Sequence, residues 1–190
     1  LWSSLEGATP GVMNMLPGFG AEAGEAIVDH HGVKMIAFTG STATGKRIMQ
    51  RGATNMKRLS LELGGKSPLI VFPDADVGKA AFLASLMGTL SSGQFCAAPT
   101  RLFVHEDVHD QFVEMVAGIF QGHKLGRWTE EGVTNGPVIS ENQLNKILGY
   151  IKSGQDQGAT LVTGGKRLDR EGFFIEPTLF TNVTDDMKIA

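Results

Sequence analysis

The 190-residue sequence predicts an α/β fold in two parts, built on parallel strands. Short apolar runs alternate with segments of helical periodicity, and turns rich in glycine separate them. Hydrophobic residues make up 42% of the chain and charged residues 19%, which is typical of a globular protein and excludes disorder. Glycine accounts for 25 of the 190 residues, above its usual share of about 7%, so many backbone positions need tight turns or close approach to a neighbour.

Charge, hydropathy and cysteine usage exclude several classes of protein. The formal net charge is −3 at pH 7, so the chain lacks the basic face that nucleic-acid binding requires. The longest apolar stretch, 80–90, falls short of the ~20 residues that cross a bilayer, so no membrane span is expected. The single cysteine excludes an internal disulfide and indicates a reducing compartment. We expect the protein in the cytoplasm, and an organelle is the alternative location.

The first third of the chain has the order of a βαβ unit with a parallel sheet. Turns containing glycine follow the first two apolar runs, and each turn leads into a helical stretch. We expect strands over 11–16, 33–39 and 57–63, and helices over 21–29 and from the loop 40–45 to about residue 51.

After residue 65 the sequence begins a second layered unit. Asp76 is the expected N-cap of an apolar helix that ends near residue 90. Asp107 is the expected N-cap of a helix whose apolar face repeats from 108 to 119. Ser140 and Gln143 form a capping box that begins another helix. Strands are expected over 69–72, 101–105 and 173–179.

Two glycine-rich segments resemble nucleotide-binding loops only in part. Gly40 to Gly45, followed by Lys46, matches most of a phosphate-binding loop, but Arg47 stands where that loop needs a hydroxyl for Mg²⁺. Two interpretations of this segment remain. It is either a strand-to-helix turn that presents backbone N–H groups to a pyrophosphate, or a strand-to-helix turn that binds no ligand. The glycines of 18–24 are spaced one residue too widely for a dinucleotide fingerprint, which favours a simple turn.

The segment 105–109 matches the H-E-x-x-H pattern of zinc enzymes, which needs both histidines on one helical face. His105 instead ends an apolar strand, and the N-cap expected at Asp107 separates it from His109. A surface histidine pair is therefore favoured, no metal site is expected, and a zinc hydrolase is the weakest of the functions considered.

Cys96 and Glu62 are the strongest candidates for chemistry. Cys96 lies in a loop of small residues, 91–99, where reactive groups are commonly presented. Glu62 interrupts a leucine-rich strand, and an apolar environment would raise the pKa of its carboxyl towards that of a general base.

At these residues the chain resembles the NAD(P)-dependent aldehyde dehydrogenase superfamily. Residues 61–68, Leu-Glu-Leu-Gly-Gly-Lys-Ser-Pro, are similar to its glutamate signature, and 93–96, Gly-Gln-Phe-Cys, to its cysteine signature. Their separation, 96 − 62 = 34 residues, is also similar. Residues 38–45 resemble the cofactor loop and 176–178 a later strand of the family, so the resemblance covers the whole chain in order.

The resemblance implies an enzyme that oxidises an aldehyde to a carboxylic acid with NAD, or NADP. It makes Cys96 the nucleophile, which passes through a thiohemiacetal and a thioester, and Glu62 the base that activates the hydrolytic water. The Cys96 backbone N–H would supply half of an oxyanion hole. Cofactor contacts are implied for the adenosine half at Gly18, for the pyrophosphate at Gly40, Ser41, Thr42 and Gly45, and for the nicotinamide at Leu63 and Gly64.

The resemblance also implies part of a longer chain. Residues 1–65 would be the C-terminal part of a Rossmann-like NAD(P)-binding domain, and residues 66–190 the N-terminal part of an α/β catalytic domain. The whole protein would be a homo-oligomer, a dimer or a tetramer, and the isolated segment is expected to be unstable or inactive. The alternative is a truncated, non-catalytic homologue with a binding or structural role.

Overall fold

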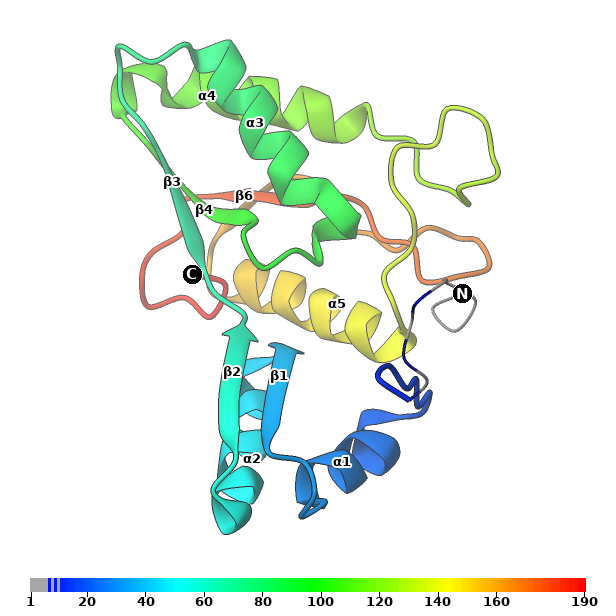
Figure 1. Cartoon of the computed structure of the whole chain (residues 1–190). Coiled ribbons are helices and arrows are strands. Elements are labelled where there is room, and N and C mark those ends of the chain that lie inside the picture. The colour runs from blue at the N-terminus through cyan, green and yellow to red at the C-terminus, as the bar shows by residue number, and fades with distance from the viewer. Residues whose placement is uncertain (1–6, 8, 10) are drawn as a thin grey trace. The chain divides into compact units, whose positions relative to one another are not determined.

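The computed structural model describes residues 7, 9 and 11–190 and separates into two compact units, Leu1–Gly64 and Gly65–Ala190. Both units have an α/β architecture in which helices pack on small sheets (Figure 1). Among the described residues, no helix is both long and apolar enough to cross a membrane.

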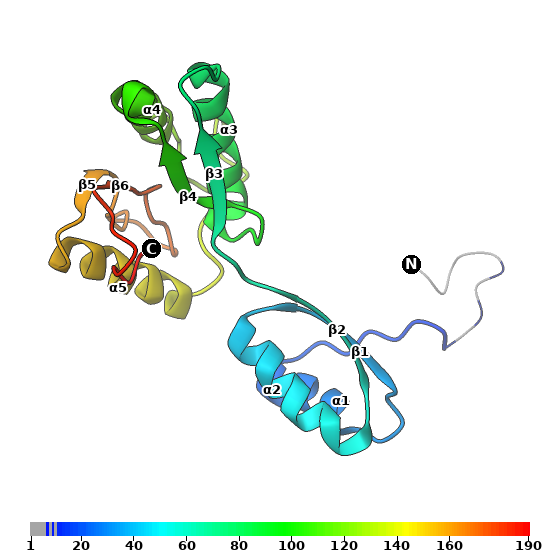
Figure 2. The ribbon, with the colours of Figure 1, turned by 90° about the vertical axis from the view of Figure 1, so that its left-hand side faces the viewer.

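The first unit is a βαβ motif preceded by a short helix (Figure 2). Strands β1 and β2 are parallel, and α2 connects them. Val28, Ile36 and Ile48 are buried together, so helices α1 and α2 cover the same face of the strand pair. The elements are the π-helical turn η2 (Gly20–Gly24), α1 (Glu25–Asp29), β1 (Met35–Gly40), α2 (Thr42–Gly52), the 3₁₀ turn η3 (Ala53–Asn55) and β2 (Arg58–Leu63).

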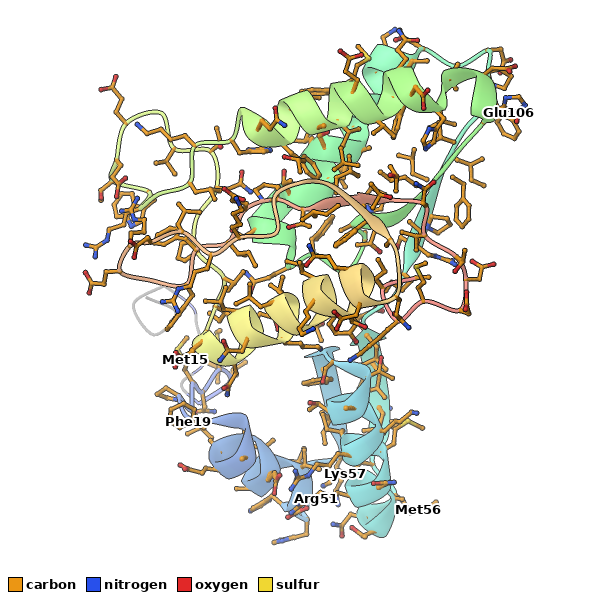
Figure 3. All side chains as sticks on the ribbon, turned by 180° about the vertical axis from the view of Figure 1, so that it is seen from behind. Met15, Phe19, Arg51, Met56, Lys57 and Glu106 are labelled. Carbon is orange, nitrogen blue, oxygen red and sulfur yellow. The ribbon has the colours of Figure 1, made fainter. Side chains whose placement is uncertain are left out.

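The strand predicted over 11–16 is wrong. Residues 11–19 form turns and irregular backbone, and no strand of the described residues pairs with them. Apolar side chains of this segment are exposed, including Met15 and Phe19 (Figure 3). An apolar run forms a strand only where a neighbouring strand takes up its backbone hydrogen bonds, and none of the described strands does so for this segment.

The second unit contains one parallel and one antiparallel strand pair. Strands β3 and β4 are parallel with α3 between them in sequence, and β5 pairs with β6 in the antiparallel direction. Side chains of α3, α4, β3 and β6 form its core, namely Val71, Ala81, Ala84, Phe112, Val116, Ala117 and Leu179. The elements are β3 (Ser67–Val71), α3 (Val77–Thr89), the turn η4 (Leu90–Gly93), β4 (Pro99–Val104), α4 (Glu106–Gln121), α5 (Glu141–Asp156), β5 (Thr160–Thr163) and β6 (Leu179–Thr181).

Two of the three expected helix caps of this unit are confirmed. The Asp76 carboxylate accepts a hydrogen bond from the Lys79 backbone N–H, and the Ser140 hydroxyl accepts one from that of Gln143. The N-cap predicted at Asp107 is wrong, because α4 begins two residues earlier. His105 caps it, with Nδ1 accepting the Asp107 N–H.

The last strand of the second unit also differs from the prediction. Residues 173–178 contribute only an isolated bridge, Arg167 to Ile175, and the strand is Leu179–Thr181. Pro177 has no backbone N–H to give to a ladder, so regular pairing begins after it. The partner strand, Thr160–Thr163, was absent from the predicted elements.

Candidate functional site

Candidate cofactor-binding residues gather at one edge of the β1–β2 pair. Gly40 ends β1 and is paired in register with Leu63, which ends β2. Because the two strands are parallel, their carboxyl ends lie at the same edge, and Ser41 and Gly64 follow there. Ligands of open α/β sheets bind beyond this edge.

Helix α2 begins directly at that edge. The Ser41 hydroxyl accepts the Thr44 backbone N–H at 3.2 Å, and the Ser41 carbonyl accepts that of Gly45 at 2.9 Å. Thr42 is the first helical residue, and no acidic side chain lies in the first turn. The N-terminus of α2 therefore offers backbone N–H groups and the positive end of a helix dipole to an anion.

Gly45 lies inside the unit, in contact with β2. A Cβ at this position would come within 2.7 Å of Leu63 Cδ2, so a larger residue would require the Leu63 side chain to move. Gly45 thus packs against β2, and the pyrophosphate contact that the resemblance implies for it stays a prediction. Gly18 is exposed in the segment before η2, beside Ala23.

A cavity of about 410 Å³ opens beside the first turn of α2. Its size suits a small-molecule ring system. One wall is the η2 turn, where Gly20 and Gly24 leave open space at their Cα atoms. The complete lining is Gly20, Ala21, Gly24, Glu25, Ile27, Val28, Ile36, Phe38, Thr44, Arg47, Ile48 and Arg51.

Charged side chains tie α1 to α2 on one side of this cavity. Glu25 pairs with Arg47 and Arg51, and Arg51 also forms an ion pair with Asp29. The hydrogen bond from Arg51 lowers the pKa of Asp29. Lys57 is buried, and its Nζ donates to the carbonyls of His30 and Val33 at 2.7 and 2.6 Å, which fastens the loop that enters β1 (Figure 3).

The expectation that Glu62 lies in an apolar environment is wrong within its unit. Side chains alternate along β2, so Leu59, Leu61 and Leu63 face the helices and Glu62 is exposed on the other face. The Glu62 carboxylate is therefore accessible on the face of β2 that the helices do not cover.

Cys96 belongs to the second unit and carries a free, exposed thiol. It lies in a turn between η4 and β4, where the Ala98 N–H donates to the Phe95 carbonyl at 3.1 Å. Ala98 is buried and anchors the turn. Within residues 7, 9 and 11–190, no acceptor is hydrogen-bonded to the Cys96 backbone N–H. An exposed thiol beside a free N–H is suited to attack on a carbonyl carbon.

His123 connects α3 to the loop that follows α4. Its Nδ1 is 2.9 Å from the Thr134 hydroxyl and its Nε2 is 3.3 Å from that of Thr89. Burial lowers the pKa of the imidazole, because the charged form loses solvation.

This lowered pKa predicts that stability falls in acid. Below the ordinary histidine pKa of about 6.5, the unfolded chain takes up a proton at His123 that the folded chain resists, so unfolding is favoured as pH decreases. Between about pH 7.5 and about pH 5.5, urea denaturation should show a larger loss of unfolding free energy for the wild type than for His123→Gln. Equal losses in the two proteins would exclude this role for His123.

The two histidines of 105–109 do not form a shared site. His105 caps α4 from outside the helix, and His109 lies inside it with Nδ1 2.9 Å from Asp110. In the part of the chain that the structure describes, no group of three histidine, cysteine or acidic side chains is placed to hold a metal ion.

The chain matches a family model described as the aldehyde dehydrogenase family, over residues 4–190. It belongs to this family. Mitochondrial aldehyde dehydrogenase of Leishmania tarentolae is 48% identical over 185 residues, which are 97% of this chain and 37% of that protein. Cytosolic aldehyde dehydrogenase 1 of Mus musculus is 47% identical, with the same coverage.

A solved aldehyde dehydrogenase has the same architecture. The NAD+ complex of the Bacillus cereus enzyme superposes with a TM-score of 0.89 at 45% identity, over 92% of this chain and 35% of that one. This likeness confirms the predicted α/β fold. The chain spans a little over a third of the length of these aldehyde dehydrogenases.

Sequence reasoning missed the walls of the cavity, although one signal for them was present. Gly20 and Gly24 lie four residues apart, and this spacing puts two positions without side chains on one face of a helical turn. Thr44 and Ile48 repeat the same spacing on the facing helix.

Proposed function

We propose that this chain is part of an enzyme that oxidises an aldehyde to a carboxylic acid with NAD+ or NADP+. The observation that carries the proposal is the exposed Cys96 thiol, whose backbone N–H is bonded to no acceptor among the described residues, in a chain of the aldehyde dehydrogenase family. The first unit would contribute part of the NAD(P)-binding domain and the second unit part of the catalytic domain.

The first unit offers a fitting place for a dinucleotide. The cavity beside η2 and α2 would hold the adenine ring, with Gly18 near the adenosine half, since glycines leave that wall free of side chains. Gly40, Ser41 and Thr42 at the start of α2 would lie against the pyrophosphate. Gly45 would let α2 pack closely against β2. Leu63 and Gly64, at the same sheet edge, would border the nicotinamide.

Cys96 would carry the covalent steps. Its Sγ, as the thiolate, attacks the carbonyl carbon, a C–S bond forms as the C=O π bond breaks, and the oxygen takes up the negative charge, which the Cys96 N–H stabilises. When bound, NAD(P)+ accepts the hydride of that carbon. Loss of the hydride leaves the substrate joined to Cys96 as a thioester.

Glu62 would release the product. Its carboxylate accepts a proton from a water molecule, whose oxygen attacks the thioester carbon. The C–S bond breaks, the carboxylic acid leaves, and Cys96 departs as a thiolate. The exposure of Glu62 on the open face of β2 supports this role, because a base must reach both water and substrate.

The test is turnover by the native protein. With an aldehyde panel and NAD+ or NADP+, we expect reduced cofactor and carboxylic acid in equal amounts. Binding of NAD(P)+ without turnover would favour the non-catalytic alternative. Sedimentation velocity on the same preparation tests the homo-oligomer that we propose for the whole protein from the family resemblance.

Filling the cavity should weaken cofactor binding. Gly24→Leu would project a side chain into the cavity from the η2 wall, and we expect the Kd for NAD+ to rise about 10-fold or more by loss of apolar contact with the ring. Gly149→Leu is the matched control, since Gly149 is an exposed helical glycine of α5 with open space around it. Calorimetry should show an unchanged Kd in the control, and an unchanged Kd in Gly24→Leu would place the adenine elsewhere.

A further inference from the structure

The backbone that leads from α3 to Cys96 has an unusual conformation. Ser91, Ser92 and Gly93 have φ angles of 51°, 58° and 76°, so three consecutive residues are left-handed. Glycine adopts this region freely, whereas serine does so at a cost. Such a run persists only where neighbouring contacts hold it in place.

Two side chains connect this run to residues more than forty positions later. The Ser92 hydroxyl donates to the Gly136 carbonyl at 2.9 Å. The Gln94 amide has two partners: Oε1 accepts the Ile139 backbone N–H at 3.0 Å, and Nε2 donates to the Ser91 carbonyl at 3.1 Å. Gln94 thus joins the left-handed run to the later segment, two residues before Cys96.

That later segment, residues 135–139, is itself fixed, and we call it the 135–139 support. Asn135 is buried and donates to the Thr89 carbonyl at the end of α3, at 2.7 Å. Val138 is 2% exposed, and its N–H donates to the Phe173 carbonyl at 2.9 Å. Burial of Asn135 and Val138 and these two hydrogen bonds anchor the support to the end of α3 and to residue 173.

We propose that Ser92 and Gln94 are positioning residues for the Cys96 thiol, because they fasten its loop to the 135–139 support. This inference rests on the proposed role of Cys96 as nucleophile. A nucleophile must meet the carbonyl carbon in a narrow range of distance and angle, and a misplacement of about 1 Å costs roughly 100-fold in rate. The left-handed run sets the direction of the loop that carries Cys96. The side chains of Ser92 and Gln94 hold the backbone of that run in its conformation.

Three substitutions in the native protein separate positioning from general stability. Ser92→Ala removes the bond to Gly136, and Gln94→Met removes both bonds of the amide at similar length. Gln94→Glu keeps an acceptor for the Ile139 N–H, and it replaces the donor to Ser91 by a carboxylate oxygen and adds a negative charge. Ser91→Ala is the matched control, since it also deletes a hydroxyl at a left-handed position, and that hydroxyl is hydrogen-bonded to none of the described residues.

Two measurements are made on each variant: deuterium exchange of the peptide backbone over 91–98, and steady-state kinetics. We expect faster exchange and a kcat lowered about 10- to 100-fold in Ser92→Ala and Gln94→Met, with KM for NAD+ unchanged. Gln94→Glu should recover part of the kcat, and Ser91→Ala should match the wild type in both measurements.

Each other outcome overturns a defined part of the inference. Unchanged exchange in Ser92→Ala and Gln94→Met would mean that these contacts do not hold the loop. Faster exchange with unchanged kcat would mean that the loop needs no such positioning. If Cys96→Ser retains turnover, the proposed function fails, and the exchange data still report whether Ser92 and Gln94 hold the loop.

Discussion

Replacing Cys96 by serine is expected to lower kcat for aldehyde oxidation roughly 10⁴-fold or more. Serine keeps the size of the side chain and the backbone N–H, but its hydroxyl is far less ionised than a thiol and is a poorer leaving group in the hydrolysis of the acyl-enzyme. The loss should appear in kcat, because no covalent intermediate then forms at a useful rate. The measurement is reduced cofactor formed under saturating aldehyde and NAD+.

The control for this variant is cofactor binding. Serine keeps the size of the Cys96 side chain, and Cys96 is none of the residues proposed to hold NAD(P)+, so the Kd for NAD+ should be unchanged by Cys96→Ser. Iodoacetamide should label Cys96 in the wild type, because the thiol is exposed, and an aldehyde substrate should slow that labelling. Full turnover with Cys96→Ser would exclude Cys96 as the nucleophile.

The sequence was sufficient for the main elements of the first unit, because each has a strong local signal. Apolar runs give β1 and β2, and a glycine-rich turn between them gives the start of α2. The expectation of an apolar environment for Glu62, which is wrong within its unit, came from treating sequence neighbours as spatial neighbours. Alternation along β2 separates Glu62 from Leu61 and Leu63, and this could be read from the sequence itself.

Other features depend on tertiary contacts, which local patterns do not contain. The strand predicted over 11–16 has suitable residues and no pairing partner among the described residues. The bond from Gln94 to Ile139 joins two loops that are 45 residues apart, so no local spacing predicts it. The left-handed backbone of Ser91 and Ser92 could not be predicted either, since serine carries no sequence signal for that conformation.

Replacing Glu62 by glutamine should slow steady-state turnover by about 10²- to 10⁴-fold while leaving acylation intact. An amide has nearly the shape of the carboxylate and cannot accept the proton of the attacking water. We therefore expect a burst of one equivalent of reduced cofactor per active site, followed by a slow phase. Mass spectrometry of the peptide that carries Cys96 should show the accumulated acyl group.

The form of the time course decides what Glu62 does. A burst with a slow second phase assigns Glu62 to hydrolysis of the thioester, since acylation is then faster than release. Slow turnover without a burst would assign it to an earlier step, such as proton transfer from the Cys96 thiol, and iodoacetamide labelling of Cys96 should then slow as well.

Glu114→Gln, the same change at an exposed carboxylate of α4, should behave as the wild type. Because Glu62 is exposed on β2, the substitution removes no buried contact in its unit, so a lowered melting temperature would point to a structural role instead.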